Sequence, residues 1–247
     1  MIGIMDFNPD QNPDKRQYIK RISSLIPADI DAKGIFFRDG NIDYSEFDAL
    51  ILSGSKLSAT DYQRMLERGE LVGDDYFDVN NAVQKLSCYQ GPMFGICFGA
   101  QILAHVMGGK LGKLDKTEAG YLEHQLTEAG KQSLVFGHLP DKFLGAHLHT
   151  DYVASLPEQE GLESKVIATR NGVIHAYSIC KNGVMRYGVQ PHPEMSNPEN
   201  ATFLVKVNEG WLRDAIGEEE YEKALRMLDN AEFGLAQTIT KFVESIR

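Results

Sequence analysis

The sequence predicts an α/β protein in which a parallel sheet continues into an antiparallel region. Short apolar runs alternate with segments of helical periodicity up to Gly109, which is typical of parallel strands joined by helices. Further along, apolar stretches are separated by Asn171-Gly172 and Asn182-Gly183, dipeptides that favour hairpin turns. With 247 residues, 43% of them hydrophobic and 24% charged, the chain can bury a full core.

The first half of the predicted parallel sheet lies before residue 60. Met1–Asp6 and Asp48–Leu52 are short apolar runs, so we expect both to be buried strands. Between them, Arg16–Leu25 carries apolar residues at the spacing of an amphipathic helix, which Pro27 ends. The order is therefore strand, helix, strand.

The second half repeats this alternation. Tyr76–Leu86 has the pattern of a helix, Pro92–Cys97 that of a strand, and Ala100–Met107 that of a second helix ended by Gly108-Gly109. From Thr117 to Tyr187 we expect the antiparallel region, continuous with the parallel sheet. Its clearest strands are Lys165–Ala168, Val173–Ile179 and Val184–Val189.

The chain after Pro193 is predicted to be helical. Asn200–Val207 and Glu218–Leu228 have helical patterns, and apolar residues from Phe233 to Ile246 share one helical face. No linker or repeat is visible, so we interpret residues 1–247 as a single domain with a helical appendage over about residues 205–247. This appendage, including the region of Trp211, packs internally in the simplest interpretation; binding a synthase or forming a dimer are the alternatives.

Charge and composition exclude several classes of partner. The 25 basic and 35 acidic side chains give a net charge of -10, which repels phosphate backbones and anionic lipid, so no nucleic acid or membrane partner is expected. No apolar run reaches the roughly 18 residues of a membrane helix. Asp6, Asp10 and Asp14 do not fit a signal peptide, and a soluble cytosolic protein is expected.

Three cysteines raise the question of a reactive thiol. Cys88, Cys97 and Cys180 are odd in number and form no CxxC pair, which predicts neither a disulfide framework nor a zinc site. Cys97 lies between glycines in Gly95–Gln101 (GICFGAQ), where a predicted strand meets a predicted helix. A sharp turn there would expose the thiol at a helix N-terminus, which stabilises negative charge, as in a nucleophile elbow. The N–H of Phe98 would then be placed to hold a developing oxyanion. The alternative is a small buried cysteine in a tight turn.

A base for this thiol is predicted after the strand Val184–Val189. His192 lies in Gln190–Glu194 (QPHPE), an irregular segment bracketed by prolines. Glu194, two residues on, would point to the same side in extended geometry and accept the other ring N–H of His192. The alternative is a surface histidine beside a solvated glutamate.

Together these segments resemble a known family. Gly95–Gln101 is similar to the cysteine motif of class I glutamine amidotransferases, and Gly188–Glu194 (GVQPHPE) is similar to their paired histidine and glutamate. Leu126–Gly130 followed by Phe136–Pro140, and His147–Asp151 before Leu156-Pro157, resemble the subgroup that contains the glutaminase half of GMP synthase. The resemblance covers residues 1–200. It implies a flavodoxin-like three-layer α/β/α fold, here with an antiparallel extension and extra C-terminal helices.

The resemblance also implies a chemistry and a set of roles. Cys97 would attack the side-chain amide of glutamine, His192 would move the protons, and Glu194 would orient His192. The stretch Ser53–Ser55 resembles the oxyanion strand of the family, so Gly54 and the N–H of Ser55 would join Phe98 around the oxyanion. The residues implied in substrate binding are Gln101, Thr150, Asp151 and, as a shaping or structural residue, His149. No metal or organic cofactor is implied for the hydrolytic step.

The departures from the family pattern leave alternatives open. Ser55 replaces a glycine, Lys56 a proline, Ala100 a histidine, and Pro191 an aromatic residue. A Ser-Gly-Ser sequence at this place is similar to that of standalone γ-glutamyl peptidases, so γ-glutamyl amides or peptides are alternative substrates. As an amidotransferase subunit, the chain would pass ammonia to a synthase subunit. In a third interpretation it is a binding or regulatory subunit without turnover.

Overall fold

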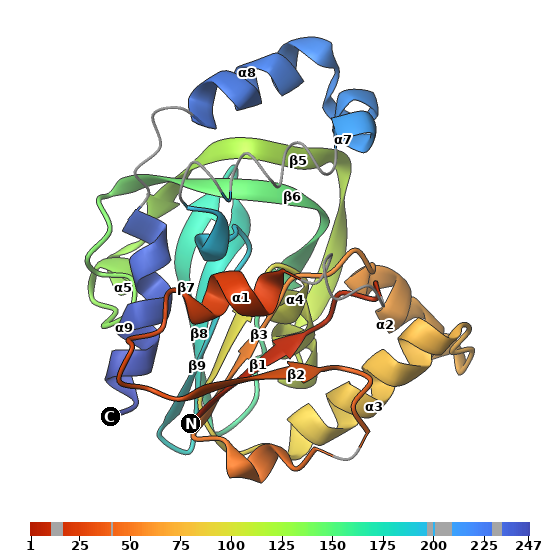
Figure 1. Cartoon of the computed structure of the whole chain (residues 1–247), viewed down its shortest axis with the longest axis vertical. Helices are drawn as coiled ribbons and strands as arrows, with labels where there is room; N and C mark the ends of the chain where they lie inside the picture. The colour runs from red at the N-terminus through yellow and green to blue at the C-terminus, as the bar shows by residue number, and fades with distance from the viewer. Residues whose placement is uncertain (11–16, 41, 197–199, 201–208, 229–233) are drawn as a thin grey trace.

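One mixed sheet of nine strands forms the framework of the described part of the chain (Figure 1). The computed structural model describes residues 1–10, 17–40, 42–196, 200, 209–228 and 234–247. The strands are β1 Ile2–Asp6, β2 Ala32–Phe36, β3 Ala49–Leu52, β4 Met93–Ile96, β5 Lys110–Leu126, β6 Lys142–Ser155, β7 Leu162–Arg170, β8 Val173–Lys181 and β9 Val184–Val189. The α-helices are α1 Tyr18–Ser23, α2 Ala59–Arg68, α3 Asp74–Cys88, α4 Phe98–Val106, α5 Glu128–Lys131, α7 Glu209–Ile216, α8 Glu218–Leu228 and α9 Gln237–Ser245.

The strand order has a parallel half and an antiparallel half. The sequence β2-β1-β3-β4-β9 is parallel throughout, which is the flavodoxin-like order of a doubly wound sheet. Antiparallel strands continue from β9 in the order β8-β6-β5-β7, and β7 pairs back with β8. The four strands β5 to β8 therefore close on themselves.

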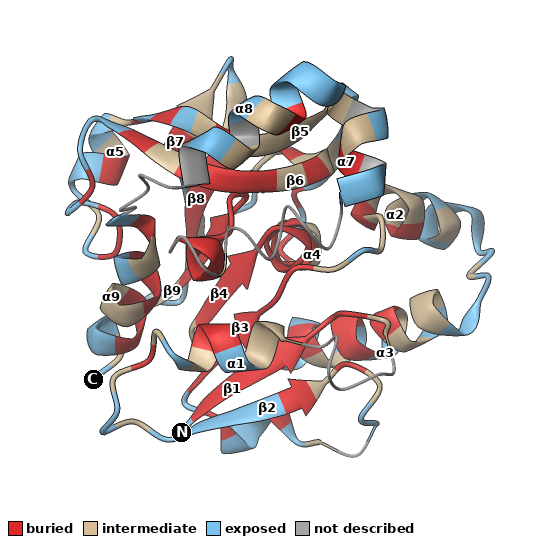
Figure 2. Ribbon diagram, turned by 45° about the horizontal axis from the view of Figure 1, so that its top comes forward, coloured by how far each residue is buried: buried red, intermediate tan, exposed pale blue. Residues whose placement is uncertain are grey.

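Alternating side chains divide the parallel sheet between two helical layers. Met5 and Leu52 belong to the apolar cluster that contains α2, α3 and α4, whereas Ile4 and Ile51 belong to the cluster that contains α1 and α9. This period of two arises because successive strand residues point to opposite faces. Figure 2 shows the parallel strands β1, β3 and β4 buried between these layers. The predicted α/β/α fold with an antiparallel extension is confirmed.

Both predicted hairpin turns adopt the backbone that their sequences favour. Asn171 and Gly172 have φ of 49° and 79°, and Asn182 and Gly183 have φ of 53° and 77°. Two successive positive φ angles define the type I′ turn, whose twist matches that of the flanking strands. These turns join β7 to β8 and β8 to β9.

The sequence missed strand β2 and helix α2. In β2 (Ala32–Phe36) only Ile35 is buried, so this edge strand lacks the apolar run that reveals a central strand. Helix α2 begins at Ala59 and is capped by Ser58, whose side chain accepts from the N–H of Asp61, a capping pattern that the prediction did not use. The predicted helix Asn200–Val207 lies, except for Asn200, outside the described residues.

The C-terminal helices pack on the rest of the molecule. Ile239, Phe242 and Val243 of α9 are buried in the cluster on the α1 face of the sheet. Leu212 of α7 and Tyr221 of α8 pack with a separate cluster on β5 and β6. The side chain of Trp211 lies outside the described part. Among the described helices, none has the length and apolar character needed to cross a membrane.

Candidate active site

Cys97 lies in a strained turn between β4 and α4. Its φ of 51° and ψ of -111° are unusual for a residue with a side chain, and the residue is only 4% exposed. Strand β4 ends one residue before it and α4 begins one residue after it. The thiol therefore stands at the N-terminus of α4, with the geometry of a nucleophile elbow.

The two glycines of the turn permit a close approach of backbones. A Cβ at Gly99 would lie 2.3 Å from the carbonyl O of Leu52, and one at Gly95 would lie 2.6 Å from the carbonyl O of Gly99. The N–H of Gly99 also donates to the carbonyl of Ser53 at 3.0 Å. Neither position has room for a side chain, because the obstructing atoms are backbone.

We expect Gly99→Ala to lower the free energy of unfolding by about 1–3 kcal/mol, since α4 must move away from β3 to admit the methyl group. Gly40→Ala is the matched control, because nothing lies within 4 Å of a Cβ at Gly40. Urea denaturation of both variants measures the difference. Equal stability of Gly99→Ala and the parent would contradict the close approach at Leu52.

His192 and Glu194 form a buried pair at the end of β9. Nδ1 of His192 lies 2.7 Å from Oε1 of Glu194, and the two residues are 2% and 1% exposed. Pro193–Met195 form a short 3₁₀ turn rather than the extended segment that the sequence predicted. The proline begins this turn, and the N–H of His192 donates to the carbonyl of Ala146 on β6 at 2.9 Å.

The environment of His192 favours its charged form. Burial by itself lowers the pKa of this imidazole, but the negative charges of Glu194 and Cys97 and the hydrogen bonds with both outweigh burial and raise the pKa to about 10. Because Glu194 receives Nδ1–H, Nε2 is the ring nitrogen left for proton exchange. Gly54 lies beside both partners: a Cβ there would be 2.8 Å from Cε1 of His192 and 3.6 Å from Cβ of Cys97.

A cavity of about 420 Å³ joins most of the predicted site residues. Its walls include eight of them: Ser55, Cys97, Phe98, Gln101, His149, Thr150, Asp151 and His192. This volume is in the range of small-molecule sites. A larger hollow of about 860 Å³, near Arg38, Lys85 and Tyr89, contains none of the predicted site residues.

The side chain of Ser55 holds the predicted oxyanion segment in place. Oγ of Ser55 donates to the carbonyl of Phe7 at 2.7 Å and accepts from the N–H of Leu57 at 3.1 Å. At the other side of the thiol, the N–H of Cys97 donates to the carbonyl of Val189 at 2.8 Å. The amide of Phe98 is the first of α4, where N–H groups have no acceptor within the helix.

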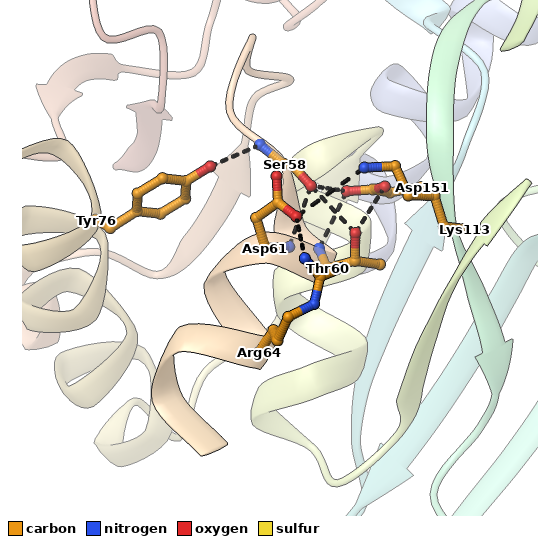
Figure 3. A network of polar contacts seen from close by, with 7 residues as sticks. All are labelled: Ser58, Thr60, Asp61, Arg64, Tyr76, Lys113 and Asp151. Atoms are coloured by element: carbon orange, nitrogen blue, oxygen red, sulfur yellow. Dashed lines mark hydrogen bonds and ion pairs between the residues drawn. The ribbon is translucent and has the colours of Figure 1, made fainter. Parts of the chain in front are cut away.

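Asp151 joins strand β6 to the start of α2 (Figure 3). Its Oδ2 accepts from Oγ of Ser58 at 2.7 Å and from the N–H of Thr60 at 3.0 Å, and its Oδ1 accepts from Oγ1 of Thr60 at 2.9 Å. Ser58 in turn caps α2 by accepting from the N–H of Asp61. The carboxylate thus anchors a helix N-terminus as well as lining the cavity.

Gln101 and His149 meet at the backbone of Asp151. Nε2 of Gln101 donates to the carbonyl of Asp151 at 2.7 Å and to Oε1 of Gln190 at 3.0 Å. Nδ1 of His149 lies 2.9 Å from the same carbonyl. Two side chains therefore hold this point of β6 in place.

The sequence missed several residues of the cavity wall, among them Tyr18 and Ser58. The ring of Tyr18 stacks on that of His192, with centroids 6.3 Å apart and planes 20° from parallel. Burial, and then the charges of Glu194 and Cys97, raise the pKa of its hydroxyl. Nothing in the sequence around Tyr18, which lies on the apolar face of a helix, indicates a functional site. For Ser58 the sequence indicates only a helix cap, because Ser58–Asp61 matches that pattern.

The comparisons with known proteins concern the family and the fold. The family model described as glutamine amidotransferase class-I matches residues 27–208. GMP synthase [glutamine-hydrolyzing] from Bacillus cytotoxicus is 25% identical over 191 residues, which cover 73% of this chain and 35% of the synthase, so the chain spans about a third of that relative.

Solved structures match over nearly the whole chain. SMU.1228c superposes with a TM-score of 0.69 at 21% identity, covering 100% of this chain and 99% of its own. A glutamine amidotransferase from Thermotoga maritima superposes with a TM-score of 0.66 at 14% identity, covering 99% and 96%. At such identities the two superpositions show the shared fold, while the family model covers more than half of the sequence. The chain belongs to the class-I glutamine amidotransferase family.

Proposed function

We propose that this protein is a cysteine-dependent amidohydrolase that cleaves the γ-carboxamide of glutamine and releases glutamate and ammonia. One observation carries the proposal. Cys97 and His192 line the same cavity, and Glu194 accepts Nδ1–H of His192 at 2.7 Å. A nucleophile, a base and a group that orients the base are the parts that such a reaction needs.

The first half of the reaction forms a thioester. Nε2 of His192 takes the proton of Cys97, and the sulfur attacks the side-chain amide carbon of glutamine. The N–H groups of Phe98 and Ser55 hold the resulting oxyanion. When this intermediate collapses, the C–N bond breaks and His192 returns the proton to the departing nitrogen, which leaves as ammonia.

The second half consumes one water molecule. His192 takes a proton from water, whose oxygen attacks the γ-glutamyl thioester at the same carbon. The C–S bond then breaks, glutamate leaves, and the sulfur recovers a proton from His192. Glu194 keeps the ring oriented and stabilises the imidazolium in both halves.

The substrate's amino acid end is assigned to β6 and α4. In this proposal Asp151 offers a carboxylate to the α-ammonium group, Thr150 belongs to the same stretch that meets the amino acid end, and Gln101 helps to hold the substrate. All three line the cavity. His149 supports this wall through its hydrogen bond to the carbonyl of Asp151.

A γ-glutamyl peptidase is the second candidate. Ser55 replaces a glycine of the family pattern, and its hydroxyl ties the oxyanion segment to Phe7. The cavity of about 420 Å³ is in the range that holds drug-sized ligands, so its volume does not restrict the substrate to glutamine.

The ammonia is proposed to pass to an acceptor enzyme on another chain. The relatives named GMP synthase [glutamine-hydrolyzing] support a role of this kind, since this chain matches about a third of such a synthase. In that case hydrolysis by the protein alone is slow and a synthase subunit accelerates it. A peptidase, by contrast, is fully active alone.

Glutamate release from glutamine and from a panel of γ-glutamyl dipeptides and amines tests the proposal. Turnover of glutamine supports the glutaminase, and faster turnover of dipeptides supports the peptidase. A glutamine-like electrophile reports on the thiol independently of turnover. Failure to label Cys97, together with no turnover of any substrate, would favour the binding or regulatory subunit.

We expect Asp151→Asn to raise KM for glutamine by about tenfold or more while also lowering stability, because it removes both the charge for the α-ammonium group and acceptors for Ser58 and Thr60. Thr60→Val removes one donor to Asp151 but keeps the charge, so it should lower stability without a comparable rise in KM. Steady-state kinetics and thermal unfolding of both variants separate the two effects. An unchanged KM in Asp151→Asn would leave Asp151 with a helix-capping role alone.

A further inference from the structure

A cluster of histidines lies behind the substrate cavity, inside the closed set of strands β5 to β8. Glu118 and His124 come from β5, His147 and His149 from β6, and His175 from β8. The four histidines are between 1% and 6% exposed, and the Glu118 side chain is 17% exposed. None of these ring nitrogens takes part in the proposed proton transfers, and only Nδ1 of His149 has an assigned function, in supporting the substrate wall.

Four of these side chains each place one possible ligand atom in the same small region. The ligand atoms of Glu118, His147, His149 and His175 all lie within 4.8 Å of one another. Nδ1 of His147 is 3.0 Å from Nε2 of His149, which is 3.2 Å from Oε2 of Glu118. Nε2 of His175 is 3.5 Å from the same oxygen. Tetrahedral Zn²⁺ with bonds of about 2.0–2.1 Å separates its ligand atoms by about 3.3 Å, close to these three distances.

The outward-facing ring nitrogens show which atoms are left to bind. Nδ1 of His149 lies 2.9 Å from the carbonyl O of Asp151, which can only accept, so Nδ1 carries the proton. In neutral His149 the lone pair is then on Nε2, facing the carboxylate of Glu118. Nε2 of His147 lies 2.8 Å from Nε2 of His124, and when it donates there the lone pair of His147 is on Nδ1, the atom that faces His149. Such outer hydrogen bonds are how metal-binding histidines are oriented.

His175 adds an unsatisfied group to the same point. It is 1% exposed, and within the described part of the chain neither of its ring nitrogens has a hydrogen-bond partner. Buried polar atoms without a partner are rare and need a physical explanation, such as a function in binding an ion. Nε2 of this ring faces Glu118, where a cation would satisfy both.

The two oxygens of the Glu118 carboxylate face different partners. Oε2 lies 3.2 Å from Nε2 of His149 and 3.5 Å from Nε2 of His175. Nε of Arg170 contacts the outer oxygen of Glu118, Oε1, at 3.3 Å and leaves Oε2 to face the histidines.

We propose that Glu118, His147, His149 and His175 bind one Zn²⁺ ion. Three neutral imidazoles and one carboxylate form a donor set that zinc prefers, and four protein ligands complete its tetrahedral shell. A closed shell leaves no position for a reacting water, so the ion is structural and separate from the proposed hydrolytic step. It joins β5, β6 and β8 at a point where the sheet has closed on itself.

The ion would support the substrate wall through His149. This histidine holds the carbonyl of Asp151, which also accepts from Gln101. Metal binding and the orientation of this part of β6 are therefore linked. The zinc proposal stands whether or not the glutaminase proposal does, because its evidence lies outside Cys97 and His192.

Metal binding is tested in the Cys97→Ala protein. Without the thiol of Cys97, the pair of Cys97 and His192 can no longer bind zinc in place of the proposed site. The protein is freed of metal with a chelator and titrated with Zn²⁺ in competition with a chromophoric chelator. We expect one equivalent of tight binding and a higher Tm in the zinc form, because a ligand that binds only the folded state stabilises it. Glu118→Gln and His175→Asn should each weaken binding by about 100-fold or more, since removal of a single outer-shell partner already costs 10–100-fold.

His138→Asn is the matched control, because His138 is exposed and bonds only to the carbonyl of Gly234 among the contacts that the structure gives it. Its zinc affinity should equal that of the parent. If the parent Cys97→Ala protein binds zinc no more tightly than a double variant with Glu118→Gln and His175→Asn, the proposal is overturned.

A second measurement does not depend on variants that fold poorly. X-ray absorption at the zinc edge of the loaded Cys97→Ala protein should give a first shell of nitrogen and oxygen at about 2.0–2.1 Å with the outer scattering of imidazole. A shell containing sulfur, or one without imidazole, would place the ion elsewhere and overturn the site.

Discussion

Replacing Cys97 by alanine is expected to lower kcat for glutamine hydrolysis by about 10⁵-fold or more, because no thioester forms without the sulfur and the residual rate comes from binding and the oxyanion donors alone. KM should change little, since the removed atom contributes to the reaction more than to binding. The fold should be retained, because Cβ of alanine occupies the place of the cysteine Cβ in the turn. Glutamate release by the purified variant measures the loss.

The other two cysteines provide the controls. Cys88 is exposed and Cys180 is half-buried, and neither lines the cavity of Cys97. Cys88→Ala and Cys180→Ala should keep full activity and still be labelled by a glutamine-like electrophile. A Cys97→Ala protein with parental activity would remove the basis of the proposed function.

Replacing Glu194 by glutamine is expected to lower kcat by about 10²–10⁴-fold with a smaller change in KM, because the amide of glutamine can donate to Nδ1 of His192 and so stabilise the wrong tautomer. The change keeps the volume of a side chain that is 1% exposed, so packing is preserved. Glu163→Gln is the control, since Glu163 pairs with Lys165 at the surface. Equal losses in the two variants, or none in Glu194→Gln, would contradict the orienting role.

The same variant should change the pH dependence of stability. Glu194 and Cys97 raise the folded pKa of His192 to about 10, above the about 6.5 of an unfolded histidine. A raised folded pKa gives a stabilising contribution that is complete below pH 6.5 and is lost as pH rises toward 10. Without the Glu194 charge the folded pKa falls, so the free energy of unfolding should vary less over this window. Urea denaturation at several pH values compares the two proteins, and identical profiles would contradict the charge coupling.

Local sequence patterns were sufficient for the central elements of the fold. Strands β1, β3 and β4 are buried on both faces, so each is a continuous apolar run that can be recognised as a strand from the local sequence alone. The edge strand β2 is exposed over its first three residues, and the pattern that reveals a strand is absent there. Helix α9 was predicted because its apolar residues share one face. The sequence did not decide whether this face packs on the rest of the chain or on a partner.

The catalytic candidates were also predictable, for a different reason. The turn at Cys97 requires nearby glycines on both sides, and His192 and Glu194 are two residues apart. Each motif therefore spans only a few consecutive residues. Asp151 was predicted as a substrate residue, but its bonds to Ser58 and Thr60 come from the start of α2, more than 90 positions away, and were not predictable.

The sequence by itself therefore determined the α/β alternation, the two hairpin turns and the candidate catalytic residues, since each depends on neighbours within one turn or one strand. The tertiary structure decided what depends on strands far apart: the stacking of Tyr18 on His192, the anchoring of α2 by Asp151, and the meeting of Glu118 with three histidines. The sequence predicted no zinc site because the expected signal was a short ligand spacing. These four ligands come from three strands, and only the closure of β5 to β8 brings their lone pairs to one point.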